Sequence, residues 1–275
     1  GVDSEGRSFT CAEEMWREEV GEDDPVKRGQ WISEGVGYWE GVEATVNGVL
    51  GGYGHVNEID IQASELFLKS ILLERFGDSG KPRRFAALDC GAGIGRVSKD
   101  LLIRYFHEVE LVEPVVHFLD AARSNLAPEN LNAPWEHKAT NFFCEPLQEF
   151  TPQDQRYDVI WVQWCIGHLS DEDFVSFFKR AKVGLKPGGF FILKENIAKS
   201  GFVLDKQDKS ITRSDLYFKQ LFHRCGLHIY KMKDQRGFPD ELFGVKMYAL
   251  TTEKDARKVR STRPKKPTNT PAIIK

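Results

Sequence analysis

The residues with the clearest chemical potential begin at a glycine-rich turn. Glycines occupy alternate positions of 91–95, after an apolar run at 85–88 and before a helical pattern. Glycine has no Cβ, so backbone N–H groups in such a turn can approach a ligand closely. Asp89 precedes the first glycine by two positions, where its carboxylate could hold an ammonium group directly or through water. The turn therefore predicts a nucleotide-type ligand site, with a plain structural turn as the alternative.

A second carboxylate stands at the end of the next expected strand. Glu113 lies 18 positions after Gly95 (113 − 95), near the roughly 20 expected for an acid that binds a ribose diol. The G-x-G-x-G spacing differs from the G-x-G-x-x-G of dinucleotide sites. No Tyr-x-x-x-Lys pair typical of many hydride-transfer enzymes is present, and Lys-Pro-Gly-Gly at 186–189 recurs in methyltransferases. S-adenosylmethionine (SAM) is therefore favoured over NAD, which remains the rival ligand.

The candidate acceptor residues follow another apolar run, 157–163. Trp164 and His168 come after it, at the carboxyl edge where parallel sheets bind ligands. The indole would form an aromatic wall and the imidazole a base, with core positions as the alternative for both. The motif [Asp/Asn]-Pro-Pro-[Tyr/Phe] of nucleobase and glutamine amino-methyltransferases is absent here. Its absence argues against that class of acceptor.

Alternating strand and helix patterns must position these residues. From residue 85 the alternation predicts an α/β fold with a mostly parallel sheet and helices on both faces. The expected strands are 85–89, 109–113, 137–144, 157–163, 189–194, 227–233 and 244–250, the last two as an antiparallel pair. The expected helices are 59–76, 96–106, 115–125, 171–184 and 214–225. The segment 195–211 is predicted to be irregular.

Composition divides the chain into three parts. Residues 1–35 are expected to form a loosely held acidic extension with a helical patch, and 36–250 the ligand-binding domain. Residues 251–275 form a basic tail that is predicted to be disordered. The tail's bases are interpreted as solvated, with a nuclear-import or nucleic-acid patch at 263–266 as the alternative.

The overall composition excludes several classes of protein. The 275 residues carry a net charge of −3, and 41% are hydrophobic, as is ordinary for a globular protein. No apolar run approaches the roughly 20 residues of a membrane span, and no secretory signal pattern is visible. The five cysteines are scattered without a C-x-x-C pair. We therefore expect no disulfide framework, no metal site and no membrane partner, and a cytoplasmic or nuclear location.

Longer motifs resemble those of the α-N-terminal protein methyltransferases, which methylate the α-amine of proteins beginning Xaa-Pro-Lys/Arg after removal of Met. The resemblance spans about 37–250 and implies a Rossmann-like SAM methyltransferase fold with a seven-stranded sheet whose last strand is antiparallel. The motifs that carry it are Tyr38-Trp39, 50–55, 88–96, 163–169, Lys194-x-Asn196 and Leu204-Asp205-x-x-Asp208.

The resemblance also implies roles for individual residues. Together with Asp89, the implied binding residues for SAM and its product S-adenosylhomocysteine are Trp39, Gly51, Gly91, Gly93, Arg96, Glu113, Leu147, Gln148 and Gln163. Arg96 would pair with the SAM carboxylate. The implied substrate-binding residues are Leu50, Val56, Trp164, Asp205, Asp208, Ser210, Leu242 and Phe243, where the last replaces the family's usual Tyr.

Three residues are candidates for the chemistry itself. His168 is a candidate base because its unperturbed pKa lies near 6.5, and Asp208 is the second carboxylate. Asn196 offers a carbonyl that can accept a hydrogen bond from the amine. The number of methyl groups added is left open. A small-molecule SAM methyltransferase and a non-catalytic module that binds SAM or nucleic acid remain the alternatives.

Overall fold

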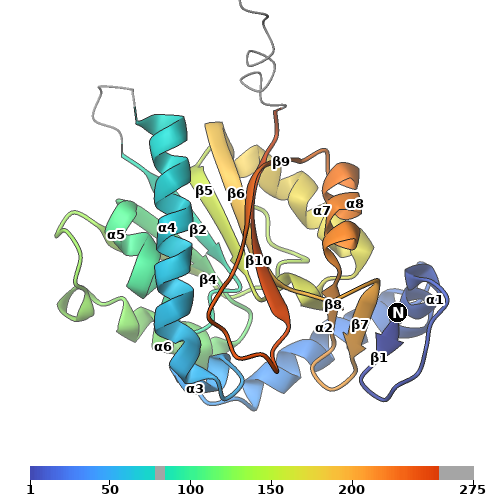
Figure 1. Cartoon of the computed structure of the whole chain (residues 1–275). Helices are drawn as coiled ribbons and strands as arrows, with labels where there is room; N and C mark the ends of the chain where they lie inside the picture. The colour runs from blue at the N-terminus through green and yellow to red at the C-terminus, as the bar shows by residue number, and fades with distance from the viewer. Residues whose placement is uncertain (78–83, 254–275) are drawn as a thin grey trace, which may run out of the picture.

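A seven-stranded sheet forms the centre of the computed structural model, which describes residues 1–77 and 84–253 (Figure 1). Its strand order is β4-β3-β2-β5-β6-β10-β9. The strands are β2 (Ala86–Cys90), β3 (Glu108–Val112), β4 (Lys138–Phe143), β5 (Tyr157–Gln163), β6 (Leu185–Ile197), β9 (His228–Asp234) and β10 (Gly244–Thr251). Neighbours from β4 to β6 are parallel, whereas β10 is antiparallel to both β6 and β9. The predicted fold class, strands and antiparallel last strand are confirmed.

Helices cover both faces of this sheet (Figure 1). On one face lie α4 (Asn57–Phe76), α5 (Ile103–Tyr105) and α6 (Val116–Asn125), and on the other α7 (Asp171–Ala181) and α8 (Asp215–Arg224). The expected helix 96–106 contains a π-helical turn, Ser98–Leu102, before α5. Strand β5 is buried at all seven positions, because apolar side chains from both helical layers pack against it. No helix of the described chain has the length and apolar character of a membrane span.

The N-terminal region is part of the packed structure, so the expectation of a loosely held extension is wrong. It contains β1 (Val2–Asp3), α1 (Ala12–Glu19) and α2 (Pro25–Glu40), and the expected boundary at 35/36 falls inside α2. Asp24 caps α2 by accepting hydrogen bonds from two backbone N–H groups. The region is held by a small apolar cluster of Phe9, Met15, Val20, Trp31, Phe202, Leu204 and Ile211. The four members from the extension, Phe9, Met15, Val20 and Trp31, are widely spaced among polar and acidic residues, and their partners lie far along the chain, so the sequence showed no pattern.

The segment 195–211 is also ordered, contrary to prediction. It contributes β7 (Phe202–Asp205) and, with the residues after it, β8 (Ser210–Arg213), which pair as a hairpin. Strand β1 adds to β7 in parallel and completes a three-stranded sheet (Figure 1). Alternate residues of both strands are buried, but each strand has only four residues, too few for a clear period-two signal. Of the predicted basic tail, only 251–253 lies within the described residues.

Candidate functional site

Two adjoining cavities open at the carboxyl edge of the sheet. The first is bordered by the turn after β2, the end of β3 and the loop after β4. The second is bordered by the hairpin β7–β8 and the loop before β10. Four side chains of predicted function line both cavities: Trp39, Leu50, Trp164 and His168. Ligands in the two cavities would therefore meet at these four shared side chains.

The cavities sort the predicted residues into two groups. The first cavity contains nearly all the predicted cofactor residues: Trp39, Asp89, Gly91, Gly93, Arg96, Glu113, Leu147, Gln148 and Gln163. The second contains most of the predicted substrate residues, Leu50, Val56, Trp164, Asp208, Ser210, Leu242 and Phe243, together with Asn196, which was predicted to take part in the chemistry. Gly51 lines the second cavity rather than the first. Asp205 lies at the end of β7 outside both linings, and its carboxylate accepts a hydrogen bond from the backbone N–H of Gln207.

The glycine turn is built for close approach of a ligand. Gly91 has φ +63°, and a Cβ on it would lie 2.3 Å from the Cβ of Cys165. Gly93 has φ +54°, but a Cβ there would meet nothing nearer than Val49 Cγ1 at 3.7 Å. A side chain is thus excluded at Gly91 by the protein itself, whereas at Gly93 it would occupy cavity space. This open face fits a bound cofactor that lies against the backbone.

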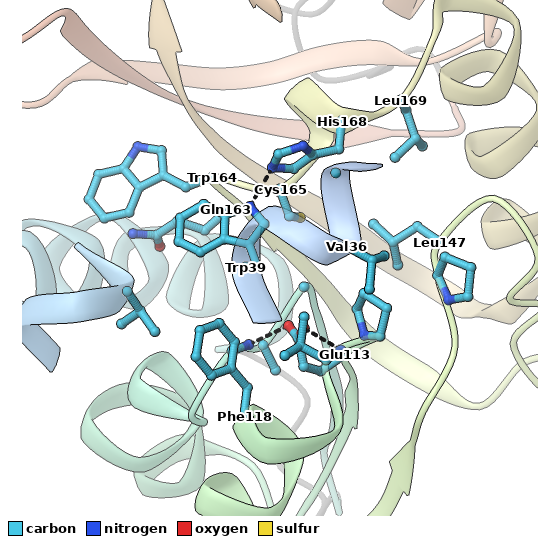
Figure 2. A pocket seen from close by; sticks show the side chains of 18 of the residues that line it. Val36, Trp39, Glu113, Phe118, Leu147, Gln163, Trp164, Cys165, His168 and Leu169 are labelled. Carbon is cyan, nitrogen blue, oxygen red and sulfur yellow. Dashed lines mark hydrogen bonds between the residues drawn. The ribbon is translucent and has the colours of Figure 1, made fainter. Parts of the chain in front are cut away.

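Glu113 is held at the floor of the first cavity by the backbone. Its Oε2 accepts a hydrogen bond from Gly93 N at 2.8 Å, and its Oε1 accepts one from Val115 N at 2.9 Å (Figure 2). Each carboxylate oxygen keeps a further lone pair for a hydroxyl donor. Burial raises the pKa of Glu113 to about 7 and outweighs the two hydrogen bonds. Asp89 is likewise buried, accepts a hydrogen bond from Ser98 Oγ at 2.7 Å, and has its pKa raised to about 6.

The raised pKa of Glu113 gives a prediction for cofactor binding. Ribose hydroxyls would donate to the charged carboxylate and lower its pKa, so SAM binding should release a proton, and the affinity for SAM should increase as pH rises to about 7. Separately, the free energy of unfolding of the ligand-free protein should fall as pH rises from 4.5, the ordinary pKa of the group, to about 7, because the folded state binds the proton more tightly than the unfolded state. Calorimetry in buffers of different ionisation heat measures the proton. Equal proton release by Glu113→Gln would contradict the role.

A buried charge network supports the cofactor cavity, and the sequence predicted no role for two of its members, Asp60 and Lys194. Asp60 on α4 accepts hydrogen bonds from Arg96 Nη1 at 2.7 Å and Gln163 Nε2 at 3.0 Å. Lys194 Nζ on β6 lies 2.5 Å from the same carboxylate. Burial alone would raise the pKa of Asp60, but Lys194 and Arg96 lower it below its ordinary value. The available sequence signal was Asp60 itself, an acidic residue on the apolar, buried face of the predicted helix 59–76.

Arg180 is a third residue whose role the sequence did not reveal. Its Nη2 donates to the backbone carbonyls of Leu147 and Gln148, each at 2.9 Å. These contacts fix the loop after β4 that borders the first cavity. Arg180 stands in the last turn of α7, where a basic residue is ordinary at a helix end. Its sequence position therefore carried no signal of this function.

Trp164 is held in an unusual backbone conformation at the end of β5. Its φ is +52°, a value that non-glycine residues rarely adopt, and such residues gather at functional sites. The indole Nε1 is buried and has no hydrogen-bond partner among the described residues. The ring lies beside Phe238, with centroids 6.2 Å apart. Trp164 thus lines the boundary of the two cavities, while its indole N–H stays buried without a partner among the described residues.

Asp208 lies in the turn between β7 and β8 and faces the second cavity. Ser210 Oγ donates a hydrogen bond of 2.6 Å to its Oδ1. Burial raises the pKa of Asp208, against the opposing effects of Ser210 and His168. A carboxylate with a raised pKa is suited to accept a proton near neutral pH.

His168 is more tightly held than the predicted role of a base suggests. Its Nε2 lies 3.0 Å from Trp39 Nε1, and its Nδ1 lies 3.1 Å from the backbone oxygen of Lys209 (Figure 2 shows the first). Its own backbone oxygen accepts a hydrogen bond from Trp31 Nε1 at 2.8 Å. Burial lowers the pKa of the imidazole, although Asp208 opposes this. The ring is therefore neutral at physiological pH.

Comparison with known proteins gives consistent matches. The family model described as "AdoMet dependent proline di-methyltransferase" matches residues 27–251. Alpha N-terminal protein methyltransferase 1 from Arabidopsis thaliana is 65% identical, across 100% of this chain and 99% of the relative. N-terminal Xaa-Pro-Lys N-methyltransferase 1-B from Xenopus laevis is 42% identical, across 80% and 95%. The solved structure of a SAM-dependent methyltransferase from Leishmania major is 38% identical with a TM-score of 0.79, across 91% and 95%.

Proposed function

The chain belongs to the alpha N-terminal protein methyltransferase family, and we propose that it methylates the free α-amine of proteins beginning Xaa-Pro-Lys, with SAM as the methyl donor. The observation that supports this most directly is the pair of cavities that share one aromatic wall. A methyl donor and an acceptor amine must meet in line, and Trp39 and Trp164 border both cavities at the place where they would meet.

The first cavity has the groups that SAM requires. The open backbone at Gly93 and the carboxylate of Glu113 suit a nucleoside, and Arg96 suits the carboxylate of an amino acid. Arg96 uses Nη1 to bind Asp60 and Asn57, and its planar fork carries further N–H donors. When bound, SAM supplies a methyl group on a positively charged sulfur. The aromatic faces beside the cavity tolerate such a cation.

The second cavity suits a proline followed by a basic residue. Leu50 and Val56 provide an apolar surface for the proline ring, and Asp208 with Ser210 provides acceptors for the cation of the third residue. Asp205, three residues before Asp208, adds negative charge, which contributes to the raised pKa of Asp208. A guanidinium binds carboxylates at least as well as an ammonium, so we propose that Arg is accepted in place of Lys. Leu242 and Phe243, from the loop before β10, also line this second cavity.

The enzyme must deliver the amine without its proton. An α-amine has a pKa of about 7.7–8.0, so at pH 7 roughly nine-tenths of it is protonated and unreactive. Deprotonation costs only about 1 kcal/mol at equilibrium, so orientation is the larger part of the task. We assign proton acceptance to Asp208, and orientation of the amine to the Asn196 carbonyl, both of which line the second cavity.

We further propose a cytoplasmic or nuclear location. All five cysteines are free thiols in the structure, a pattern typical of reducing compartments. The proposed reaction needs a protein N terminus and SAM, and it requires neither a membrane surface nor a nucleic acid.

Mass spectrometry of peptides incubated with SAM tests the proposal. A Ser-Pro-Lys peptide should gain one or more methyl units, and a Ser-Pro-Arg peptide should do the same. The same peptides with an acetylated N terminus are the control and should gain none. Methylation of an internal lysine in the acetylated peptides, without product on the free α-amine, would overturn the proposal.

A further inference from the structure

The two hydrogen bonds of the His168 ring determine where its proton lies. Trp39 Nε1 stands 3.0 Å from Nε2, and an indole N–H is a donor only, so Nε2 must be an unprotonated acceptor. The Lys209 carbonyl oxygen stands 3.1 Å from Nδ1, and a carbonyl is an acceptor only, so Nδ1 must carry the proton. The ring is therefore the neutral Nδ1–H tautomer, and its one basic lone pair already binds Trp39.

One face of α2 encloses this histidine. Trp31, Gly35 and Trp39 are spaced four residues apart and so lie along the same side of the helix. Trp31 binds the backbone oxygen of His168, and Trp39 binds its ring. Gly35 lies between them, where the ideal Cβ position is 3.5 Å from Nδ1, an ordinary contact distance, so the helix backbone approaches the imidazole closely here. The helix thus binds His168 through two tryptophans that stand two turns apart.

The groups around the ring also disfavour a second proton. The titratable side chain that faces it is Asp208, from the β7–β8 turn, and burial outweighs the attraction of this carboxylate, so the pKa of His168 stays below its ordinary value. Lys209 meets the ring through its backbone, while its Nζ lies 3.2 Å from Glu34 on α2 and 3.4 Å from Glu19 on α1. A proton on Nε2 would set two N–H groups against each other and release Trp39.

We propose that His168 is a positioning residue and that it does not accept the proton in methyl transfer. It holds the Trp39 indole at the boundary of the two cavities, and it connects α2 to the turn that carries Asp208. This role rests on the proposed function, because both the indole and Asp208 act on the reaction there. It leaves Asp208 as the residue that takes the proton.

Nitrogen NMR of the full-length protein tests the ring without any assay of activity. The His168 signals, assigned by their loss in His168→Gln, should show a neutral Nδ1–H tautomer from pH 6 to pH 8. An Nε2–H tautomer, or an imidazolium near pH 7, would overturn the proposal. If no peptide were methylated but the tautomer were as expected, the proposed function would fail while the geometry of the ring stood.

Kinetics of two His168 variants separates positioning from base catalysis. A Gln side chain can still accept a hydrogen bond from Trp39 but cannot act as a base, whereas Ala does neither. We expect His168→Ala to lower kcat roughly a hundredfold through misplacement of the site. His168→Gln should stay within about tenfold of the parent, because one hydrogen bond is kept, and its kcat should keep the same pH profile. If kcat fell equally in both variants, and the rise of kcat with pH disappeared, His168 would be the base and the proposal would be overturned.

Trp39→Phe provides a matched test from the other partner. It keeps an aromatic ring but removes the Nε1–H that binds His168. If the two residues act through this hydrogen bond, the effects of Trp39→Phe and His168→Ala on kcat should be non-additive in the double variant. Additive effects would mean that each residue acts separately, and would contradict the proposed coupling.

Discussion

Asp208→Asn is expected to lower kcat for an Xaa-Pro-Lys peptide by about tenfold at pH 7, because roughly nine-tenths of the α-amine is then protonated and the variant can use only the free remainder. The amide keeps the size of the carboxyl group and its contact with Ser210 Oγ, but it cannot take a proton from the α-ammonium. Asp208 lines only the second cavity, so the dissociation constant of SAM should stay unchanged. Single-turnover mass spectrometry and calorimetry with SAM measure the two quantities separately.

The matched control for this prediction is Asp205→Asn. Asp205 precedes Asp208 by three residues in the same turn, but it binds Gln207 N and does not line the second cavity. Its replacement should weaken peptide binding modestly and leave kcat near the parent value. A loss of kcat as large as that of Asp208→Asn would indicate that the turn as a whole, rather than the Asp208 carboxylate, supports turnover.

The pH dependence of kcat tests the role of the Asp208 carboxylate further. Asp208 must be ionised to accept a proton, so kcat should rise with pH through its raised pKa. In Asp208→Asn this limb should vanish, and only the titration of the substrate amine at about 7.7–8.0 should remain. An unchanged limb in the variant would assign it to another group.

The sheet could be predicted because its strands are buried on both faces. Strand β5 is apolar at nearly every position and was predicted with its observed limits, Tyr157–Gln163. Such strands appear as continuous apolar runs bounded by turns. The glycine turn and Glu113 were predictable for a related reason: in parallel sheets the carboxyl ends of strands meet at one edge. Short-range sequence patterns therefore carry both the fold and the cofactor side of the site.

The missing parts depend on contacts between distant segments. Asp60 and Lys194 are 134 positions apart, and their pairing becomes visible only when α4 packs on β6. The same holds for Trp31 and His168, which are 137 positions apart. Chemistry assigned to His168 from its residue type alone made it a base, whereas its two hydrogen-bond partners restrict it to another role. Residue type predicts what a side chain can do, and its partners decide which of these it does.

Asp60→Asn is expected to lower the free energy of unfolding by about 3–5 kcal/mol, because removing one partner leaves buried charges uncompensated. The side chain of Arg96 is 6% exposed and that of Lys194 is 0% exposed, so water cannot replace Asp60 as the partner of Lys194 and reaches Arg96 only from the cavity side. The variant should also bind SAM more weakly, since Asp60 positions both Arg96 and Gln163 in the first cavity. Denaturant unfolding and calorimetry measure the two effects.

Asp120→Asn is the control for this loss of charge. Asp120 pairs with Arg123 at 2.7 Å, but their side chains are 64% and 46% exposed, so water replaces the lost partner and the cost should stay below about 1 kcal/mol. Should Asp60→Asn fail to fold, Lys194→Met offers a milder test, since Asp60 then keeps Arg96 as its counter-charge. It should unfold more easily than the parent yet still bind SAM. If Asp60→Asn lowered the free energy of unfolding no more than Asp120→Asn does, the network would be contradicted, because losing the partner of a buried charge should cost much more than losing the partner of an exposed one.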